Sequence, residues 1–384
     1  MKPVVLFWVQ HLLGSGHLRR TAAIARALAA RGVDAVVASG GFPLSNLDLG
    51  DARLIQLPAL RAADEGFSGL IDQAGEPASG SLMAARQNQL TGLLDTLQPA
   101  ALVTETFPFG RRQLRHEVLG LLDHAGGLER PPVTVCSVRD ILQRPSKPER
   151  FDTMLALALE RFDHILVHGD PRLAAFGETF PHAAALGQRL IHTGYIAADW
   201  APPEDRDGAG ADEVIVSAGS GATGAALLAA ARQARALSGQ AANRTWRLLS
   251  GEPHAANPGG DAGEKSEQGI IIENNRADFR DLLARCAVSV SQGGYNTITD
   301  LIAARARAVV VPYVGEGETE QTERSRRLAA LGSVIMLDEA DLAPQSLAQA
   351  VDAAFDLSPL SADLIDLGGA DYSAERLCNW IGHV

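Results

Sequence analysis

Short runs rich in Val, Ile and Leu alternate along this sequence with amphipathic stretches that are long enough to form helices. The runs over residues 4–9, 33–38 and 101–104 are examples from the first half of the chain. Strands that alternate with helices form right-handed βαβ units. Nearly unbroken apolar strands are typical of parallel sheets that are covered on both faces. The alternation therefore predicts an α/β protein with doubly wound parallel sheets.

The segment 201–212, with the sequence APPEDRDGAGAD, interrupts this alternation, which restarts after it. Its Pro, Gly and Asp content and its lack of periodicity are typical of a linker. The sequence predicts an N-terminal Rossmann-like domain over residues 1–200, a second one over 213–370 and a closing C-terminal helix over 371–384. Residues 254–268 are expected to form a surface loop. The two domains are expected to face each other across a cleft, which is where open α/β sheets bind ligands.

Composition narrows the class of protein. Lys and Arg total 34 against 46 for Asp and Glu, which gives a net charge of −12. This balance argues against general nucleic-acid binding, which needs a basic surface. The three cysteines are widely spaced and form no metal-binding pattern. The sequence shows neither a secretory signal nor an apolar stretch of membrane-spanning length. A cytoplasmic location is therefore expected.

A small-residue loop, Gly14-Ser15-Gly16, follows the first predicted strand and precedes His17. Free N–H groups at a helix start can bind an anion. A helix start also disfavours protonated histidine, so His17 would suit a general base near neutral pH. The alternative is that His17 only caps the helix or packs beneath the loop. Both interpretations are open at the level of sequence.

Two glycine-rich loops occur in the second half, and each opens a predicted helix. The first contains Gly219, Ser220 and Gly221, and the second contains Gly293, Gly294, Tyr295 and Asn296. Loops of this kind suit phosphate oxygens, although close helix packing also favours glycine. Asp300, in the second of these helices, could bind ribose hydroxyls, and Glu320 with Gln321 could bind sugar hydroxyls. Alternatively, Asp300 and Glu320 are solvent-exposed helix charges.

Three further candidates follow strands of the first half. Glu105 or Asp140 could orient His17 or an acceptor hydroxyl, and Arg139 could bind an acidic acceptor. The alternative is that these residues form ion pairs, such as Arg139 with Asp140 or Arg111 with Glu105. A core or capping role is favoured for His168, which also follows a strand.

Taken together, the early Gly-x-Gly-His, the mid-chain linker and the Ser-x-Gly-Gly-x-x-Thr…Asp…Val-Pro-Tyr…Glu-Gln pattern of residues 291–321 resemble GT-B glycosyltransferases. The pattern is most similar to the MurG-like group, of the glycosyltransferase family 28 type. The resemblance covers nearly the whole chain and is strongest over 291–337. It implies a GT-B fold and an inverting, metal-independent transfer of a sugar from a nucleotide-diphosphate donor, with UDP favoured, to an unknown acceptor.

The resemblance also assigns roles to individual positions. It implies that Asp300 holds the donor ribose and that Arg276 lies where the backbone frames the nucleotide base. The glycine-rich loops would contact the diphosphate, Glu320 with Gln321 would bind the donor sugar, and His17 would be the histidine of the cleft. No cofactor is implied, because helix N-termini and loop amides can stabilise the leaving diphosphate. A lipid-linked acceptor would bring the protein to a membrane surface.

The first loop departs from the MurG-like pattern. It is shorter and poorer in glycine, and arginines at positions 19 and 20 follow His17. The pattern Gly14-x-Gly16-His17-x-x-Arg20 instead resembles the MurG-like nucleotide-sugar hydrolase of pseudaminic acid synthesis, in which the histidine activates water. Hydrolysis is therefore one alternative function. A non-catalytic nucleotide-sugar-binding protein is another.

Overall fold

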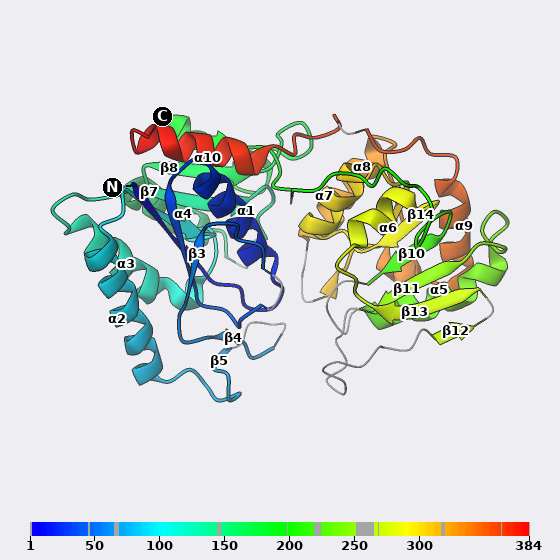
Figure 1. Ribbon diagram of the computed structural model, residues 1–384, viewed down its shortest axis with the longest axis horizontal. Coiled ribbons are helices and arrows are strands. Elements are labelled where there is room, and N and C mark those ends of the chain that lie inside the picture. Colours follow the sequence, from blue (N-terminus) through cyan, green and yellow to red (C-terminus); the bar gives the residue numbers. More distant parts are fainter. Residues whose placement is uncertain are drawn as a thin grey trace. The chain divides into compact units, whose positions relative to one another are not determined.

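The computed structural model describes residues 2–44, 47–64, 69–143, 147–197, 199–218, 224–250, 265–267, 269–315, 319–361 and 363–383. The chain forms two compact units (Figure 1). The first contains Met1–Asp199 and Asp366–Val384, and the second contains Trp200–Ile365. The C-terminal segment therefore returns to the first unit.

The first unit is built on a seven-stranded parallel sheet with the order β3-β2-β1-β6-β7-β8-β9. Reversal of the strand order beside β1 is the pattern of a doubly wound fold. The strands are β1 (Val4–Val9), β2 (Asp34–Ser39), β3 (Arg53–Gln56), β6 (Ala101–Glu105), β7 (Val133–Arg139), β8 (His164–His168) and β9 (Leu190–His192). A separate two-stranded sheet pairs β4 (Arg61–Ala62) with β5 (Leu70–Ile71).

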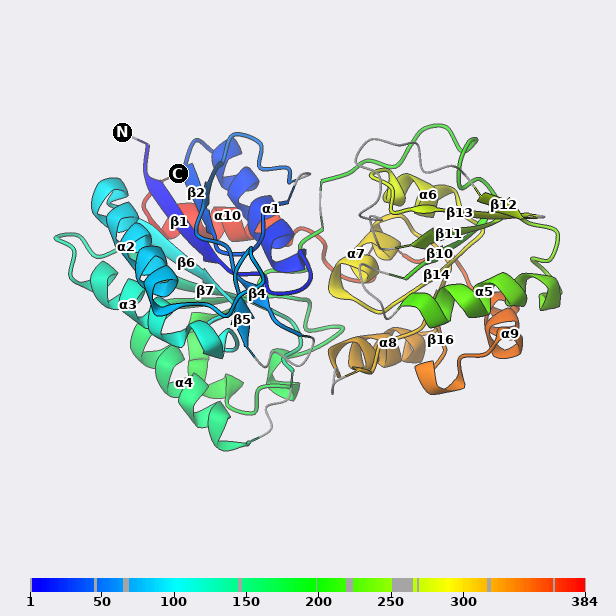
Figure 2. The same ribbon diagram turned by 90° about the horizontal axis from the view of Figure 1, so that it is seen from below.

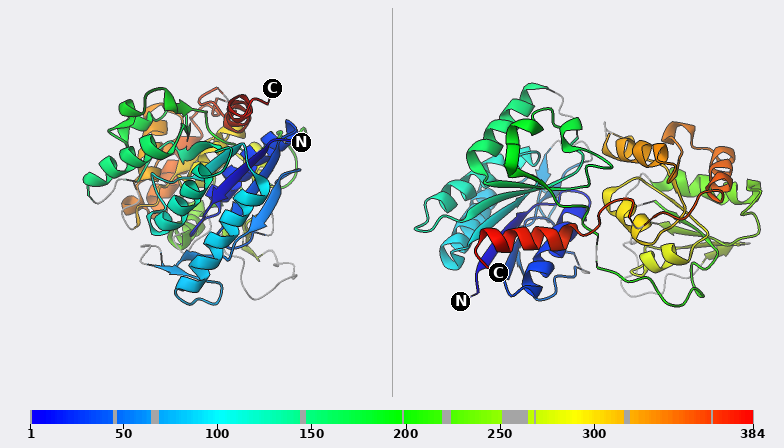
Figure 3. Two further views of the ribbon diagram at one scale, coloured as in Figure 1. Left: turned by 90° about the vertical axis from the view of Figure 1, so that its left-hand side faces the viewer. Right: turned by 90° about the horizontal axis from the view of Figure 1, so that it is seen from above.

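Helices cover both faces of this sheet (Figure 2). One face packs against α2 (Gly80–Leu97), α3 (Arg115–Gly126) and α4 (Glu149–Arg161). The other packs against α1 (Gly16–Ala30) and the C-terminal helix α10 (Gly369–Trp380). Helix α10 lies beside α1 (Figure 3). Burial on both faces explains why these strands are almost entirely apolar.

The second unit repeats the design with the strand order β12-β13-β11-β10-β14-β15-β16, in which β12 alone is antiparallel to its neighbour. Its strands are β10 (Val214–Ser217), β11 (Trp246–Ser250), β12 (Lys265–Glu267), β13 (Ile270–Asn274), β14 (Val288–Ser291), β15 (Ala308–Val310) and β16 (Ile335–Met336). Its helices are α5 (Ala225–Leu237), α6 (Phe279–Arg285), α7 (Tyr295–Ala303), α8 (Glu320–Ala330) and α9 (Pro344–Ala354). The predicted fold class of two doubly wound units is confirmed.

Several details differ from the sequence prediction. The first unit ends at Asp199, and residues 201–212 belong to the second unit. Arg206 donates a hydrogen bond to the carbonyl of Ala284 at 3.0 Å, which ties this segment to α6. The second unit ends at Ile365, so residues 366–370 belong with the C-terminal helix. Within the predicted loop 254–268, residues 265–267 form β12, and the remainder lies outside the described residues.

Candidate functional site

Parallel pairing brings polar side chains together at the carboxyl ends of neighbouring strands in the first sheet. Glu105 is the last residue of β6 and is aligned with Ser137 of β7. His168 is the last residue of β8 and is aligned with Arg139. Glu105, Ser137 and His168 each lie two residues after Val103, Val135 and Leu166, which are on the face covered by α1, so the polar side chains share that face. The carboxyl ends of three strands therefore meet the first turn of α1, which carries His17.

His17 lies against Glu105. Its Nδ1 atom is 3.0 Å from Oε1 of Glu105, 3.1 Å from Nη2 of Arg20 and 3.2 Å from Oγ1 of Thr106. Arg20, one helical turn after His17, also donates a short hydrogen bond to the same Oε1 atom. The carboxylate is 1% exposed and accepts a further short hydrogen bond from Ser137 on Oε2.

Contact with Glu105 favours one tautomer of His17. An ionised carboxylate can only accept, so Nδ1 forms a hydrogen bond with Glu105 when Nδ1 carries the proton. The lone pair is then on Nε2, which is bound by no side chain in the described part of the chain. The His17 side chain is 14% exposed, so a substrate can reach it. The contact between His17 and Glu105 has the geometry that a general base and its orienting carboxylate require.

Electrostatics keep His17 neutral and Glu105 ionised. Burial, with the positive charges of Arg111, Arg139 and Arg20, holds the pKa of His17 well below its usual range, although the hydrogen bond to Glu105 opposes this. Burial would raise the pKa of Glu105, but the Arg20 charge and the bond from His17 outweigh it and hold that pKa far below its usual range. At neutral pH the imidazole is neutral and the carboxylate is ionised.

Thr106 shapes the turn beside this pair. Its φ is +73°, in the left-handed region that β-branched residues rarely adopt. Its N–H donates to the carbonyl of Ser137 at 2.7 Å, which stabilises this conformation. The hydroxyl is thereby held within reach of both His17 and Glu105. Strained backbone of this kind clusters at functional sites.

The other candidates in the first unit differ in their placement. Asp140 is fully buried and accepts a short hydrogen bond from the Tyr195 hydroxyl rather than one from His17. Arg139 ends β7 on the His17 face of the sheet. Arg111 donates from Nε to the carbonyl of Gln10 at 2.7 Å. Burial and the neighbouring Arg139 and Arg20 charges lower the pKa of Arg111 to about 10, despite the opposing effect of Glu105.

The loop before His17 is open. Gly14 is exposed, and a Cβ atom added there would meet nothing within 4 Å. Ser15 is the N-cap of α1, but its side chain makes no capping bond; its hydroxyl instead accepts a hydrogen bond from Arg19 at 3.2 Å. The loop leaves space for a ligand beside the start of α1 at Gly16. Anion binding there stays a prediction.

In the second unit, Arg324 connects several of the predicted donor residues. This fully buried side chain of α8 donates to the carbonyl of Gly293 at 3.3 Å and to Glu320 at 2.9 Å, and lies 5.5 Å from the Tyr295 ring centroid. Glu320 is only 2% exposed, so the alternative of a solvent-exposed helix charge is wrong for this residue. Gln321 accepts a hydrogen bond from the Tyr313 amide at 3.2 Å. The sequence pattern assigns no role to Arg324, although this residue lies one helical turn after Glu320.

Close packing explains the glycine at position 293. A Cβ atom there would lie 2.4 Å from the Ser325 hydroxyl and 3.1 Å from the carbonyl of Gln321. Gly294 is the N-cap of α7, and Tyr295 and Asn296 form its first turn. The loop therefore presents the start of a helix at the carboxyl end of β14, as an anion site would require.

The two remaining donor candidates are ion-paired. Asp300 on α7 accepts a 2.6 Å bond from Arg280 of α6. Arg276 forms two bonds with Asp278, at 2.8 and 2.7 Å. Gly219, Ser220 and Gly221 lie outside the described residues. Among the residues that the structure describes, no group of three or more His, Cys, Asp and Glu side chains could hold a metal ion.

The Arg20 charge provides a direct test of the electrostatics that lower the pKa of His17. Replacement of Arg20 by Met removes a positive charge beside His17, so we expect the pKa of His17 to rise. Neutral His17 would then be lost at a higher pH than in the wild type. An NMR titration of the imidazole signals measures this shift. Arg19→Met, an exposed neighbour on the same helix, serves as the control and should leave the titration unchanged. A lower or unchanged pKa of His17 in Arg20→Met would show that the Arg20 charge does not lower this pKa.

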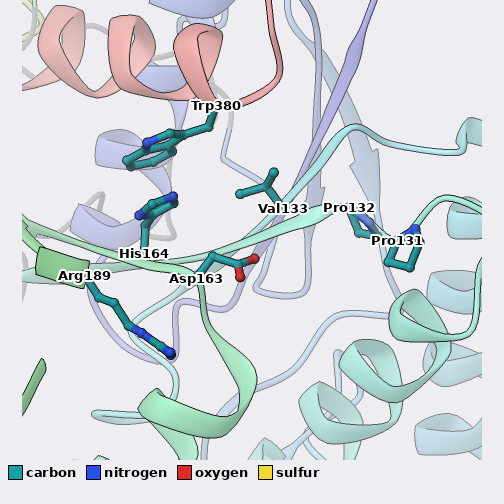
Figure 4. A pocket seen from close by; sticks show the side chains of 7 residues that line it. All are labelled: Pro131, Pro132, Val133, Asp163, His164, Arg189 and Trp380. Atoms are coloured by element: carbon teal, nitrogen blue, oxygen red, sulfur yellow. The ribbon is translucent and has the colours of Figure 1, made fainter.

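A hollow of about 540 Å³ in the first unit lies away from these residues (Figure 4). Val133 and His164, which begin β7 and β8, line it together with Trp380. The His164 and Trp380 rings are stacked, with centroids 3.7 Å apart. The hollow is thus at the amino ends of strands whose carboxyl ends carry Ser137 and His168. It is not part of the His17 site.

Comparisons with known proteins agree with this architecture. The calicheamicin glycosyltransferase CalG4 has a TM-score of 0.58 at 15% identity, over 99% of this chain and 94% of the other. The spinosyn forosaminyltransferase SpnP gives 0.60 at 14% identity, over 100% and 95%. MurG of Acinetobacter baumannii gives 0.56 at 13% identity, over 99% of both chains. At these identities the likeness establishes the fold, which is GT-B.

Sequence comparison concerns the second unit. Residues 220–360 match the Glycosyltransferase family 28 C-terminal domain. A 106-residue segment is 33% identical to the UDP-N-acetylglucosamine–N-acetylmuramyl-(pentapeptide) pyrophosphoryl-undecaprenol N-acetylglucosamine transferase of Methylobacterium radiotolerans. That match spans 26% of this chain and 28% of the relative. The chain thus has a GT-B fold, and its residues 220–360 are similar to the glycosyltransferase family 28 C-terminal domain. The MurG-like resemblance seen in the sequence is confirmed.

Proposed function

We propose that this protein is an inverting glycosyltransferase that uses a nucleotide-diphosphate sugar, with His17 as the general base. The observation that carries the proposal is the His17–Glu105 pair, in which Nδ1 is bonded to a buried carboxylate and Nε2 has no protein partner among the described residues. The family 28 domain in the same chain supports sugar transfer as the chemistry.

The proposed reaction is a single displacement. Nε2 of His17 removes the proton of an acceptor hydroxyl, and the acceptor oxygen forms a bond to the anomeric carbon. The bond between that carbon and the donor phosphate breaks on the opposite side, and the electron pair leaves with the nucleoside diphosphate. Imidazolium formed at His17 is stabilised by ionised Glu105. The oxygens of the departing diphosphate would be stabilised by N–H groups at helix starts such as that of α7.

The second unit is proposed to bind the donor. Asp300 would bind the ribose, Arg276 would frame the base, and Glu320 with Gln321 would contact the sugar. The matched relative uses UDP-N-acetylglucosamine according to its name, which supports a UDP-linked donor. Arg139 is proposed to bind an acidic group of the acceptor. The part of the chain that the structure describes contains no helix with the length and apolarity needed to cross a bilayer.

Two other functions fit parts of the same site. His17 could activate water, as in the hydrolase that the Gly14-x-Gly16-His17-x-x-Arg20 pattern resembles. A sensor could bind the nucleotide sugar without turnover. The three functions differ in whether the donor is consumed and whether an acceptor is required.

A panel of UDP-, TDP-, GDP- and CMP-sugars distinguishes them. The purified protein is incubated with each sugar without an acceptor, and free nucleotide and the melting temperature are measured. For a transferase we expect one donor to raise the melting temperature, since it binds the native state, with little release of nucleotide. That donor is then used to screen acceptor hydroxyls. Rapid acceptor-free release that requires His17 would instead establish hydrolysis, and binding with no turnover under any condition would favour a sensor.

A further inference from the structure

Behind the His17–Glu105 pair, a line of buried polar groups continues across the sheet. The Ser137 hydroxyl lies between Oε2 of Glu105 and Nε2 of His168, which is 2.8 Å away. Nδ1 of His168 is 2.9 Å from the Thr193 hydroxyl. Ser137, His168 and Thr193 are each at most 2% exposed. Four residues from β6, β7, β8 and the end of β9 thus form one hydrogen-bonded chain.

The number of protons limits how this chain can be arranged. Ser137 has one proton, and ionised Glu105 can only accept, so that proton goes to Glu105. Ser137 must then accept from Nε2–H of His168. Neutral His168 carries no second proton, so Nδ1 can only accept, and its neighbouring donor is the Thr193 hydroxyl, which also lies 2.8 Å from the carbonyl of Gly194. Every bond in the chain is satisfied only when all donors point toward Glu105.

The opposite arrangement requires a different charge state. If Glu105 carried a proton on Oε2, it could donate to Ser137, Ser137 to His168 and His168 to Thr193. The Arg20 guanidinium on Oε1 disfavours protonation of Glu105. Complete burial, together with the nearby Arg20 charge, lowers the pKa of His168 to about 3, against the opposing effects of Glu105 and Asp140, so a charged imidazolium is excluded at neutral pH. The arrangement directed at Glu105 therefore prevails.

Arg20 explains why the position of the carboxylate matters. Its Nη2 is 3.1 Å from Nδ1 of His17, close enough to donate a hydrogen bond there. Glu105 opposes this, because its Oε1 accepts from Arg20 and also accepts the proton on Nδ1, which leaves Nδ1 no lone pair for Arg20. If Glu105 rotated away, Arg20 could donate to Nδ1. His17 would then carry its proton on Nε2 and could no longer act as a base.

We propose that Ser137 and His168 are positioning residues, which hold the Glu105 carboxylate in the orientation that keeps the lone pair of His17 on Nε2. This inference rests on the proposed role of His17 as the base. It assigns a function to two buried residues that contact neither substrate nor His17. Arg111, Arg139 and Asp140 are the other charged groups around this network, and the variants below leave them in place.

Four variants test the proposal. Ser137→Ala removes the donor to Glu105, and His168→Phe removes the donor to Ser137 while keeping an aromatic ring at this position. His168→Gln retains an N–H at a similar position and serves as the conservative rescue. The control is Ser39→Ala at the end of β2. Its buried hydroxyl has no hydrogen-bond partner among the residues that the structure describes, so a methyl group there removes no bond.

We expect kcat to fall about 10-fold in Ser137→Ala and His168→Phe, with the donor KM unchanged, because a hydrogen bond to a charged group is lost. His168→Gln should be closer to the wild type than to His168→Phe, and Ser39→Ala should equal the wild type. Unchanged kcat in both Ser137→Ala and His168→Phe would overturn the proposal. An equal loss in His168→Gln and His168→Phe would likewise overturn it, because the retained donor would then be irrelevant.

The tautomer of His17 provides a readout that needs no substrate. Nitrogen-15 NMR of the full chain, labelled at histidine, distinguishes protonated from bare ring nitrogens, and a His17→Gln variant assigns the signals. We expect Nδ1–H in the wild type and a growing share of Nε2–H in Ser137→Ala and His168→Phe. A wild-type tautomer in both variants would refute the positioning role. Altered tautomers in a protein that transfers no sugar would instead preserve the network and refute the proposed function.

Discussion

Replacement of His17 by Ala is expected to lower kcat by about 10²- to 10⁴-fold, the usual contribution of a general base. The donor KM should change little, because His17 is proposed to meet the acceptor hydroxyl and not the nucleotide. Asp140, another candidate catalytic residue, is buried and accepts a hydrogen bond from Tyr195, so we do not expect it to replace His17 as the base. The measurement is steady-state kinetics with the donor and acceptor that the screens identify.

Two controls show whether a loss of activity in His17→Ala comes from misfolding or from the removal of any histidine. His17→Ala should retain the donor-induced rise in melting temperature, since the donor is proposed to bind the second unit. His116→Ala removes an exposed histidine from α3, on the other face of the sheet, and should keep full activity. Added imidazole is expected to restore part of the lost turnover. Turnover at the wild-type rate in a folded His17→Ala protein would remove His17 from the mechanism.

The strength of the apolar pattern explains how much of the fold could be predicted. The apolar runs at residues 4–9, 33–38 and 101–104 all form strands, and the first strand matches over all of Val4–Val9. Strands as short as β4 and β5, with two residues each, are too brief to show an alternation. Helix α9 was missed, although Pro344 at its start and the spacing of Leu347 and Val351 are helix signals.

Predicting the site required knowledge of which strand ends are neighbours. The sequence could place Glu105, Asp140 and His168 after strands, but it could not say which of them faces His17. That choice depends on strand order and register, which align Glu105 with Ser137. Ser137 was missed because a serine within an apolar strand gives no signal by itself. Aligning the polar residues at the carboxyl ends of adjacent predicted strands would have revealed it.

A second buried charge cluster gives the largest expected effect on stability. Arg86 of α2 is completely buried and donates twice to Glu117 of α3, at 2.7 and 2.8 Å. It also donates to Gln10 and to two backbone carbonyls, so all five of its N–H groups are bonded. Glu117 accepts in addition from the Trp8 indole at 2.9 Å. This cluster fastens two helices to the first strand.

Replacement of Arg86 by Met should therefore lower the free energy of unfolding by about 3–5 kcal/mol, because Glu117 would stay buried without its counter-charge. For a unit of this size that corresponds to a fall in melting temperature of about 10 °C. Urea denaturation and calorimetry measure both quantities. Arg53→Met is the matched control, since Arg53 pairs with Asp34 at the surface and should cost less than about 1 kcal/mol.

The double variant Arg86→Met/Glu117→Leu separates charge burial from packing. If the cost of Arg86→Met comes from the uncompensated carboxylate, removal of that carboxylate should make the double variant more stable than the single one. If the cost comes from the carbonyls that lose their donor, the double variant should be no more stable. The first outcome is expected, because an unpaired buried charge costs more than an unpaired carbonyl.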